Sequence, residues 1–306
     1  MISIKSQLFK KATWLVLLLS VPLVGILIAS AQISGESSAS ALMPAHDKYG
    51  EPKQICKLEC LSIRESSGIA ASRFNRDRFW THNDSGDRPR VFAFDIGGNH
   101  LGTCRIEGAA AVDWEDMAAF ELDGKEYLLI ADTGDNLARR KHVVLYLVEE
   151  QSPDVETWQV VQTVKFTYND KPHDCESIAF DPSTRQVLLV TKDWKITSKV
   201  FAFEWPTEPS TETIKATQIA TLPYPGATAM DISPDHQRAV VLTYTDAFEY
   251  SKAQGEGWAE AFSRVGRLIK MPERGQGESI CYALDGWTLF LTSEASPTPL
   301  YRVPVK

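Results

Sequence analysis

A short sequence pattern recurs five times in this chain and limits the possible folds more than any other feature. Each copy opens on a carboxylate or a glycine, followed by small, polar and apolar residues. The copies are ESSGIAAS (65–72), DWEDMAAFE (113–121), DCESIAFDP (174–182), GATAMDISPD (226–235) and GESICYALDG (277–286). They begin about 50 residues apart, which is the length of one blade in repeat proteins of the propeller type.

Each copy is followed by further strand-like runs, in which β-branched and aromatic residues alternate with turns rich in Gly, Pro, Asn and Asp. The fifth copy has only three such runs before the chain ends at Lys306, whereas an unassigned strand-like stretch, ICKLECLSI (55–63), precedes the first. If that stretch completes the last unit, the ring closes and protects its edges. The sequence therefore predicts an all-β fold, a β-propeller of five four-stranded blades closed by the N-terminal strand. An open β-sandwich is the alternative, and a short helix is expected around 258–262.

The N-terminal segment has a different character. Lys5, Lys10 and Lys11 precede an apolar run at 14–28, and Ala29-Ser30-Ala31 forms a small-residue cleavage signature. This pattern predicts a secretory signal peptide over 1–31, with an uncleaved membrane anchor as the alternative. Residues 32–54 are expected to form a flexible leader and 55–306 a single domain. The protein would then be periplasmic or secreted, monomeric, and in contact with a membrane only through an uncleaved N-terminal segment.

Charge excludes one class of partner. The chain carries a net charge of −8. Removal of residues 1–31 would make this charge more negative, because that segment contains three lysines and no acidic residues. Nucleic acids require clustered Lys and Arg, so no nucleic-acid binding is expected. Cationic or neutral ligands suit such a surface better. The 5 cysteines fit no zinc spacing, and the sequence leaves both disulfides and buried thiols open.

The predicted topology gathers polar residues on one face. Because neighbouring strands are antiparallel, the start of each first strand and the end of each second strand lie at the same end of a blade. Alignment of the five copies places one residue of each around the axis: Ser67, Glu115, Glu176, Thr228 and Glu278. The candidate ligand-binding residues on this face are Asn83, Asp87, Trp114, Asp135, Asp193, Asp246 and Glu294.

Carboxylates that converge on a narrow mouth must take up protons or hold a cation. Oxygen ligands without paired Cys or clustered His favour calcium or magnesium over zinc, and calcium is the predicted cofactor. The candidate metal ligands are Glu115, Asp132, Asn136, Glu176 and Glu278. The alternative is that these side chains form ion pairs with Arg139, Arg140 and Lys192.

Two functions fit this face. The first is a recognition module that binds a small molecule, a glycan or an envelope protein. The second is a calcium-dependent hydrolase of an ester, lactone or phosphoester, in which His82 or Asp84 acts as general base. His82 is the plausible imidazole at the strand ends, with His173 near the third copy as a second candidate, although a single loop histidine is more often a hydrogen-bonding residue. No nucleophile motif is present.

The motifs WTHNDSGD (80–87), DWEDMA (113–118) and ADTGDN (131–136), with the later DISPD, QGES and TSE, cover nearly all of the predicted mature chain. In these motifs the chain resembles an uncharacterised family of exported bacterial β-propellers. It is more distantly similar to the gluconolactonase/regucalcin and phytase-like propellers. That resemblance implies metal-dependent hydrolysis at a carboxylate-lined axial site. The chain departs from those enzymes in its expected blade number and has no position-by-position match to their ligands, so the activity cannot be carried over.

Overall fold

Strands dominate residues 48–306, which are the part of the chain that this computed structural model describes. All of these residues belong to one unit that spans Pro44–Lys306. The all-β prediction is confirmed, and the described part contains one α-helix, α1 (Trp258–Ser263), where a short helix was expected. The predicted signal peptide and most of the predicted leader lie outside the described residues. No helix of residues 48–306 is long and apolar enough to cross a membrane.

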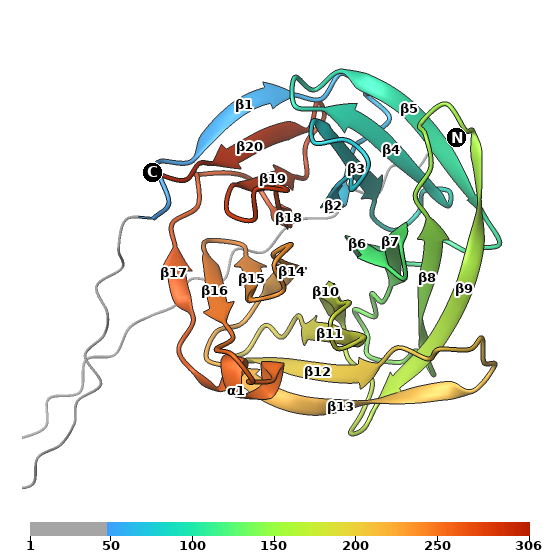
Figure 1. Ribbon diagram of the computed structural model, residues 1–306, viewed down its shortest axis with the longest axis vertical. Helices are drawn as coiled ribbons and strands as arrows, with labels where there is room; N and C mark the ends of the chain where they lie inside the picture. The colour runs from blue at the N-terminus through green and yellow to red at the C-terminus, as the bar shows by residue number, and fades with distance from the viewer. Residues whose placement is uncertain (1–47) are drawn as a thin grey trace, which may run out of the picture. The chain divides into compact units, whose positions relative to one another are not determined.

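The strands form consecutive antiparallel units of four (Figure 1). The first unit comprises β2 (Ser66–Ala71), β3 (Arg78–Asn83), β4 (Arg90–Asp95) and β5 (His100–Glu107). The second comprises β6 (Trp114–Leu122), β7 (Lys125–Asp132), β8 (Val143–Glu149) and β9 (Thr157–Tyr168). The third comprises β10 (Cys175–Asp181), β11 (Gln186–Thr191), β12 (Ser198–Glu204) and β13 (Thr213–Leu222). The fourth comprises β14 (Ala227–Ile232), β15 (Arg238–Thr243), β16 (Ala247–Ser251) and β17 (Arg267–Ile269).

The last unit joins the two ends of the described chain. It comprises β18 (Gly277–Tyr282), β19 (Leu289–Ser293), β20 (Pro299–Val303) and the N-terminal β1 (Lys53–Lys57), which pairs antiparallel with β20. A bridge between Tyr49 and Val305 extends this pairing. The strand was expected at 55–63. It ends earlier because the chain turns after Lys57. In this turn Ile63 N donates to Cys60 O at 3.0 Å, and the side chains of Leu58 and Ile63 are buried.

The first strand of each unit lies innermost, and these strands follow one another around a common centre (Figure 1). β2 contacts β6, β6 contacts β10, β10 contacts β14, β14 contacts β18, and β18 contacts β2 again. On the outside, the long strand β9 also pairs in parallel with β5 and with β13, which links the first three units into one sheet.

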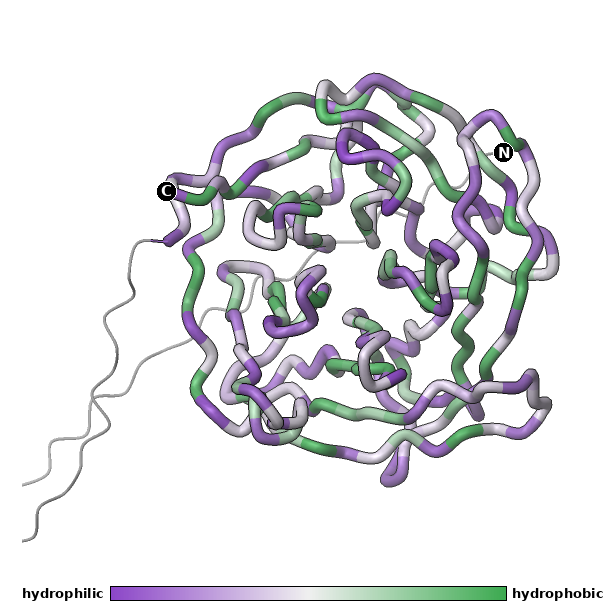
Figure 2. Tube along the Cα trace, in the orientation of Figure 1, coloured by the Kyte–Doolittle hydropathy of each residue, from purple (hydrophilic) through white to green (hydrophobic). Residues whose placement is uncertain are grey.

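Apolar side chains fill the space between adjacent units. Between the first and second units, Trp80, Trp114 and Trp158 are each at most 1% exposed, and Trp80 and Trp158 meet edge to face at 4.7 Å between ring centroids. The outermost strands alternate hydrophobic and hydrophilic residues (Figure 2), because only one side of them faces this core. The five cysteines all lie within residues 48–306 and are free thiols that form no disulfide with one another.

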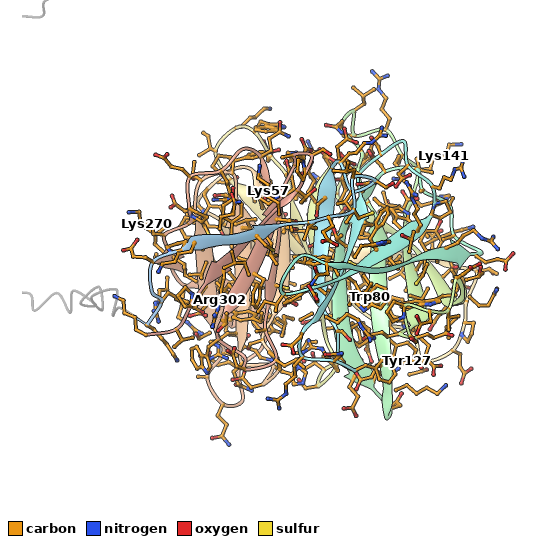
Figure 3. The ribbon with its side chains drawn as sticks, turned by 90° about the horizontal axis from the view of Figure 1, so that it is seen from above. Lys57, Trp80, Tyr127, Lys141, Lys270 and Arg302 are labelled. Atoms are coloured by element: carbon orange, nitrogen blue, oxygen red, sulfur yellow. The ribbon has the colours of Figure 1, made fainter. Side chains whose placement is uncertain are left out.

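The turn that joins β6 to β7 and the loop that follows β7 lie at opposite ends of β7. Tyr127, near the start of β7, and Lys141, in the loop that follows β7, lie at opposite sides of the view in Figure 3. The side that contains Lys141 also receives the start of β6, since β6 and β7 are antiparallel and pair Trp114 with Asp132. The predicted polar residues therefore lie on this side, which we call the strand-end face.

Candidate functional site

Every innermost strand carries the same irregularity at its start. The register with the second strand shifts between Ser66 and Gly68 in β2, and the same shift occurs once in each of β6, β10, β14 and β18. The residues at the five shifts are Ser67, Glu115, Glu176, Thr228 and Glu278. A β-bulge leaves an extra residue unpaired and redirects its side chain. The five positions aligned from the sequence are thus equivalent in the structure.

Two of these five positions tie neighbouring units together. Ser67 Oγ donates to Glu115 O at 2.6 Å, and Thr228 Oγ1 donates to Gly277 O at 2.7 Å. Both hydroxyls are buried. Their role is structural, and the three glutamates are the ionisable members of the set.

Carboxylates gather where the first three units meet. Oxygen atoms of Asp84, Asp113 and Glu115 all lie within 4.8 Å of one another, and so do those of Glu115, Asp174 and Glu176. Glu115 belongs to both groups. We call these five residues the carboxylate cluster. Its members come from the loop after β3, from the residues that lead into β6 and β10, and from the starts of those two strands.

Gly134 makes room for this cluster. A Cβ atom at position 134 would lie 2.0 Å from Glu115 Oε1 and 2.4 Å from Asp113 Oδ2, well inside contact distance. Gly134 N also donates to Asp113 O at 3.2 Å. The glycine of the DTGDN motif therefore permits the close approach of backbone and carboxylates, which a larger residue would displace.

The cluster is electrostatically unfavourable without a counter-ion. Burial, together with repulsion from Asp84 and Asp174, raises the pKa of Asp113 to about 6. Burial, followed by repulsion from Glu176, also raises the pKa of Glu115 well above its usual range. Carboxyls in this state either bind protons or attract a cation.

Lys192 neutralises one side of the cluster. Its ammonium group donates to Glu176 Oε1, whereas Glu176 Oε2 is buried and has no hydrogen-bond partner among the described residues. Burial raises the pKa of Glu176, an effect that Lys192 opposes. Beyond Lys192, Glu278 accepts from Gln276 Nε2 at 3.2 Å, and burial raises the pKa of Glu278 to about 7. The alternative of an ion pair with Lys192 thus holds for Glu176.

The structure separates the predicted metal ligands. Glu115 and Glu176 lie in the carboxylate cluster, but Glu278 is outside both groups. Asp132 pairs with Arg140 Nη1 at 2.7 Å and accepts hydrogen bonds from the backbone N–H groups of residues 112 and 113. Asn136 is exposed in the loop after β7. Asp132 therefore fixes the chain that leads into β6.

The two predicted catalytic residues lie in different environments. Asp84 is half-buried within the cluster. His82 is fully buried, donates from Nδ1 to Asn83 O at 3.0 Å, and packs edge to face on Trp114 at 5.4 Å. Burial lowers the pKa of His82. A neutral imidazole without solvent contact is suited to packing, so the burial of His82 disfavours its role as a general base.

Several predicted ligand-binding residues hold loops in place. Asn83 Oδ1 accepts from Arg64 N at 2.9 Å, and its Nδ2 donates to Asp87 at 2.7 Å. Asp87 is also paired with Arg90 at 2.8 Å. Asp135 accepts from the backbone N–H groups of Arg139 and Arg140 at 2.9 and 2.7 Å. Trp114 is 1% exposed and donates to Ala110 O at 2.7 Å.

The remaining predicted residues line the strand-end face of the last three units. Asp193 and Asp246 are half-buried, and Asp193 Oδ1 accepts from Lys195 N at 2.9 Å. Glu294 accepts from Gln276 Nε2 at 2.9 Å, and burial raises its pKa. Glu294 therefore shares the Gln276 amide with Glu278.

Sequence reasoning missed Asp113 and Asp174 as cluster members. Both stand two residues before a bulge glutamate, in Asp113-Trp114-Glu115 and Asp174-Cys175-Glu176. This repeated D-x-E spacing was available in the sequence and would have identified them. The chain matches no protein-family model, and no curated protein matches it.

Proposed function

We propose that the five units form a five-bladed β-propeller and that its strand-end face is a cation-dependent binding surface. Two observations support the fold proposal: the innermost strands contact one another in cyclic order, and β1 completes the last unit. Propellers use radial repetition to leave only short, protected strand edges. Binding at one end of the ring fits the presence of the carboxylate cluster there.

The observation that carries the function is the sharing of Glu115 between two groups of three carboxylates. Five acidic side chains at this separation bring more negative charge together than Lys192 and Arg140 can offset. A cation of high charge density would relieve the repulsion that raises the pKa values of Asp113 and Glu115. The buried, unpartnered Glu176 Oε2 favours a bound ion.

Calcium fits this donor set best. It takes six to eight oxygen ligands in flexible geometry, whereas magnesium demands a tighter octahedron and zinc prefers nitrogen and sulfur. The residues that would hold the ion are Asp84, Asp113, Glu115, Asp174 and Glu176. When bound, calcium would lock the first three units together and offer open coordination positions to a ligand.

Binding is favoured over hydrolysis by the state of His82. A hydrolase of the proposed type needs a base that reaches the bound water. His82 is fully buried, and Asp84, the other candidate, would be one of the ligands of the ion. We therefore infer that the protein is a recognition module of an extracytoplasmic compartment, which uses the ion to orient a neutral or cationic partner.

The test is calcium binding by the full chain, measured by isothermal calorimetry after chelation and dialysis. We expect one calcium ion per chain and a higher melting temperature in its presence. Glu115→Gln should weaken calcium binding at least about tenfold, since it removes the ligand common to both groups. Glu212→Gln, at an exposed position remote from the cluster, is the matched control. Absence of calcium binding, or equal binding by Glu115→Gln, would overturn the proposal.

A further inference from the structure

Trp194 is the one exposed tryptophan among residues 48–306. It is 65% exposed, whereas Trp80, Trp114, Trp158 and Trp258 are at most 1% exposed. Its indole is stacked on the ring of Tyr244, with 5.4 Å between centroids and 14° between planes. Because one face of the indole is covered by Tyr244 and most of the residue remains exposed, the opposite face is open to solvent.

The stacked pair is built from two units and fixed beside the carboxylate cluster. Trp194 follows β11 and Tyr244 follows β15. The Lys192 ammonium lies 5.1 Å from the Trp194 ring centroid and 5.2 Å from that of Tyr244, and the same ammonium is held by Glu176. We call Trp194 and Tyr244 the aromatic platform. Its position next to Glu176 connects it to the proposed ion site.

Donors and acceptors of hydrogen bonds are mixed around the platform. Lys192 and Gln276 Nε2 are donors, and Glu278 and Glu294 are acceptors. The Tyr244 hydroxyl, which can do both, interacts with Lys192 and Glu278. A ligand that matches this arrangement must itself carry groups that both donate and accept.

We propose that the aromatic platform binds a sugar ring of an uncharged glycan. A pyranose has an apolar C–H face that can lie on the open side of Trp194, and its hydroxyls both donate and accept hydrogen bonds around the rim. An organic cation is disfavoured because the Lys192 ammonium, 5.1 and 5.2 Å from the two ring centroids, would repel it. An anion is disfavoured by the carboxylates of the same face. This inference rests on the proposed binding function and names its ligand class.

The test uses neutral oligosaccharides as probes: cello-, malto- and chito-oligosaccharides of four to six sugars, titrated into the full chain with and without calcium. Binding is followed by tryptophan fluorescence and calorimetry. We expect at least one series to bind, and Trp194→Ala to weaken that binding about tenfold or more, as loss of a central aromatic contact does. Trp194→Phe should retain part of the affinity. Phe74→Ala, an equally exposed aromatic position in the β2–β3 turn, should have no effect.

Three outcomes would overturn the inference. They are the absence of binding to every series, equal binding by wild type and Trp194→Ala, and Trp194-dependent binding of tetramethylammonium in place of the sugars. Calcium calorimetry on the same samples separates this inference from the proposed ion site. Calcium binding without glycan binding rejects only the platform, and glycan binding without calcium binding rejects only the ion site.

Discussion

Asp116 and Met230 lie 114 residues apart in the chain, yet Asp116 Oδ2 accepts a hydrogen bond from Met230 N at 3.1 Å. The same oxygen accepts from Ile178 N at 2.9 Å, and Oδ1 accepts from Met117 N at 2.8 Å. One fully buried carboxyl on β6 thus joins three innermost strands, β6, β10 and β14. It directly follows Glu115 in the chain, so it fixes the backbone beside the carboxylate cluster.

We expect Asp116→Asn to destabilise the protein by about 2–4 kcal/mol, because an amide group replaces one acceptor with a donor and faces buried N–H groups. The loss would be read as a lower midpoint in urea unfolding with an unchanged slope. Asp154→Asn, at an exposed position, is the control and should change stability by less than about 0.5 kcal/mol. Equal midpoints for the two variants would contradict this role of Asp116.

The arrangement of strands was predictable because it is periodic. Five copies of one pattern, each followed by alternating strands and turns, identify the units and their order, and the incomplete fifth copy points to β1 as its missing strand. The boundaries of β1 were less predictable, because the turn at 58–63 depends on burial of Leu58 and Ile63 against other units.

The site was predictable only in part. The bulge glutamates Glu115 and Glu176 follow from the repeat, since equivalent positions of equivalent strands share a face. The partners of Asp132 and Trp114 do not follow from it. Arg140 reaches Asp132 through the fold of the loop after β7, and no local pattern distinguishes an aspartate that binds an ion from one that is already paired.

The close approach at Gly134 predicts a sharp effect of a single methyl group. Gly134→Ala would place Cβ against Glu115 Oε1 and Asp113 Oδ2, so both carboxylates must shift away from it. We expect calcium affinity to fall at least about tenfold and the calcium-induced rise in melting temperature to shrink. Calorimetry and thermal unfolding would measure both.

Gly275→Ala is the matched control for this variant. A Cβ added at position 275 would lie 3.7 Å from Glu294 O, which is an ordinary contact distance. The backbone of Gly275 is not in the left-handed region. Wild-type calcium affinity in Gly134→Ala would show that the cluster does not need this space.

Glu278 predicts how stability depends on pH. Burial raises its pKa to about 7, although Lys192 and Gln276 act in the opposite direction, and an unfolded glutamate has a pKa of about 4.3. A group with a raised pKa in the folded state contributes stability that is complete below the unfolded value and is lost as the pH rises through the folded value. In chelator, we therefore expect the contribution of Glu278 to stability to decline between about pH 4 and pH 7.

Glu278→Gln should flatten that decline, since glutamine cannot ionise. Urea unfolding at several pH values would compare the slope for this variant with that for wild type and for the exposed Glu212→Gln. Identical slopes in all three proteins would exclude Glu278 as a source of the pH dependence.

The pairing of β1 with β20 predicts the effect of shortening the chain. A protein that begins at Glu59 lacks β1 and the bridge between Tyr49 and Val305, whereas one that begins at Lys48 keeps both. Loss of β1 leaves β20 as an exposed edge. We expect the shorter protein to melt at least about 10 °C lower and to aggregate on heating, and the longer one to match the full chain. Calorimetric scans of the three proteins would test this. Equal melting temperatures would mean that the ring of units is stable without its N-terminal strand.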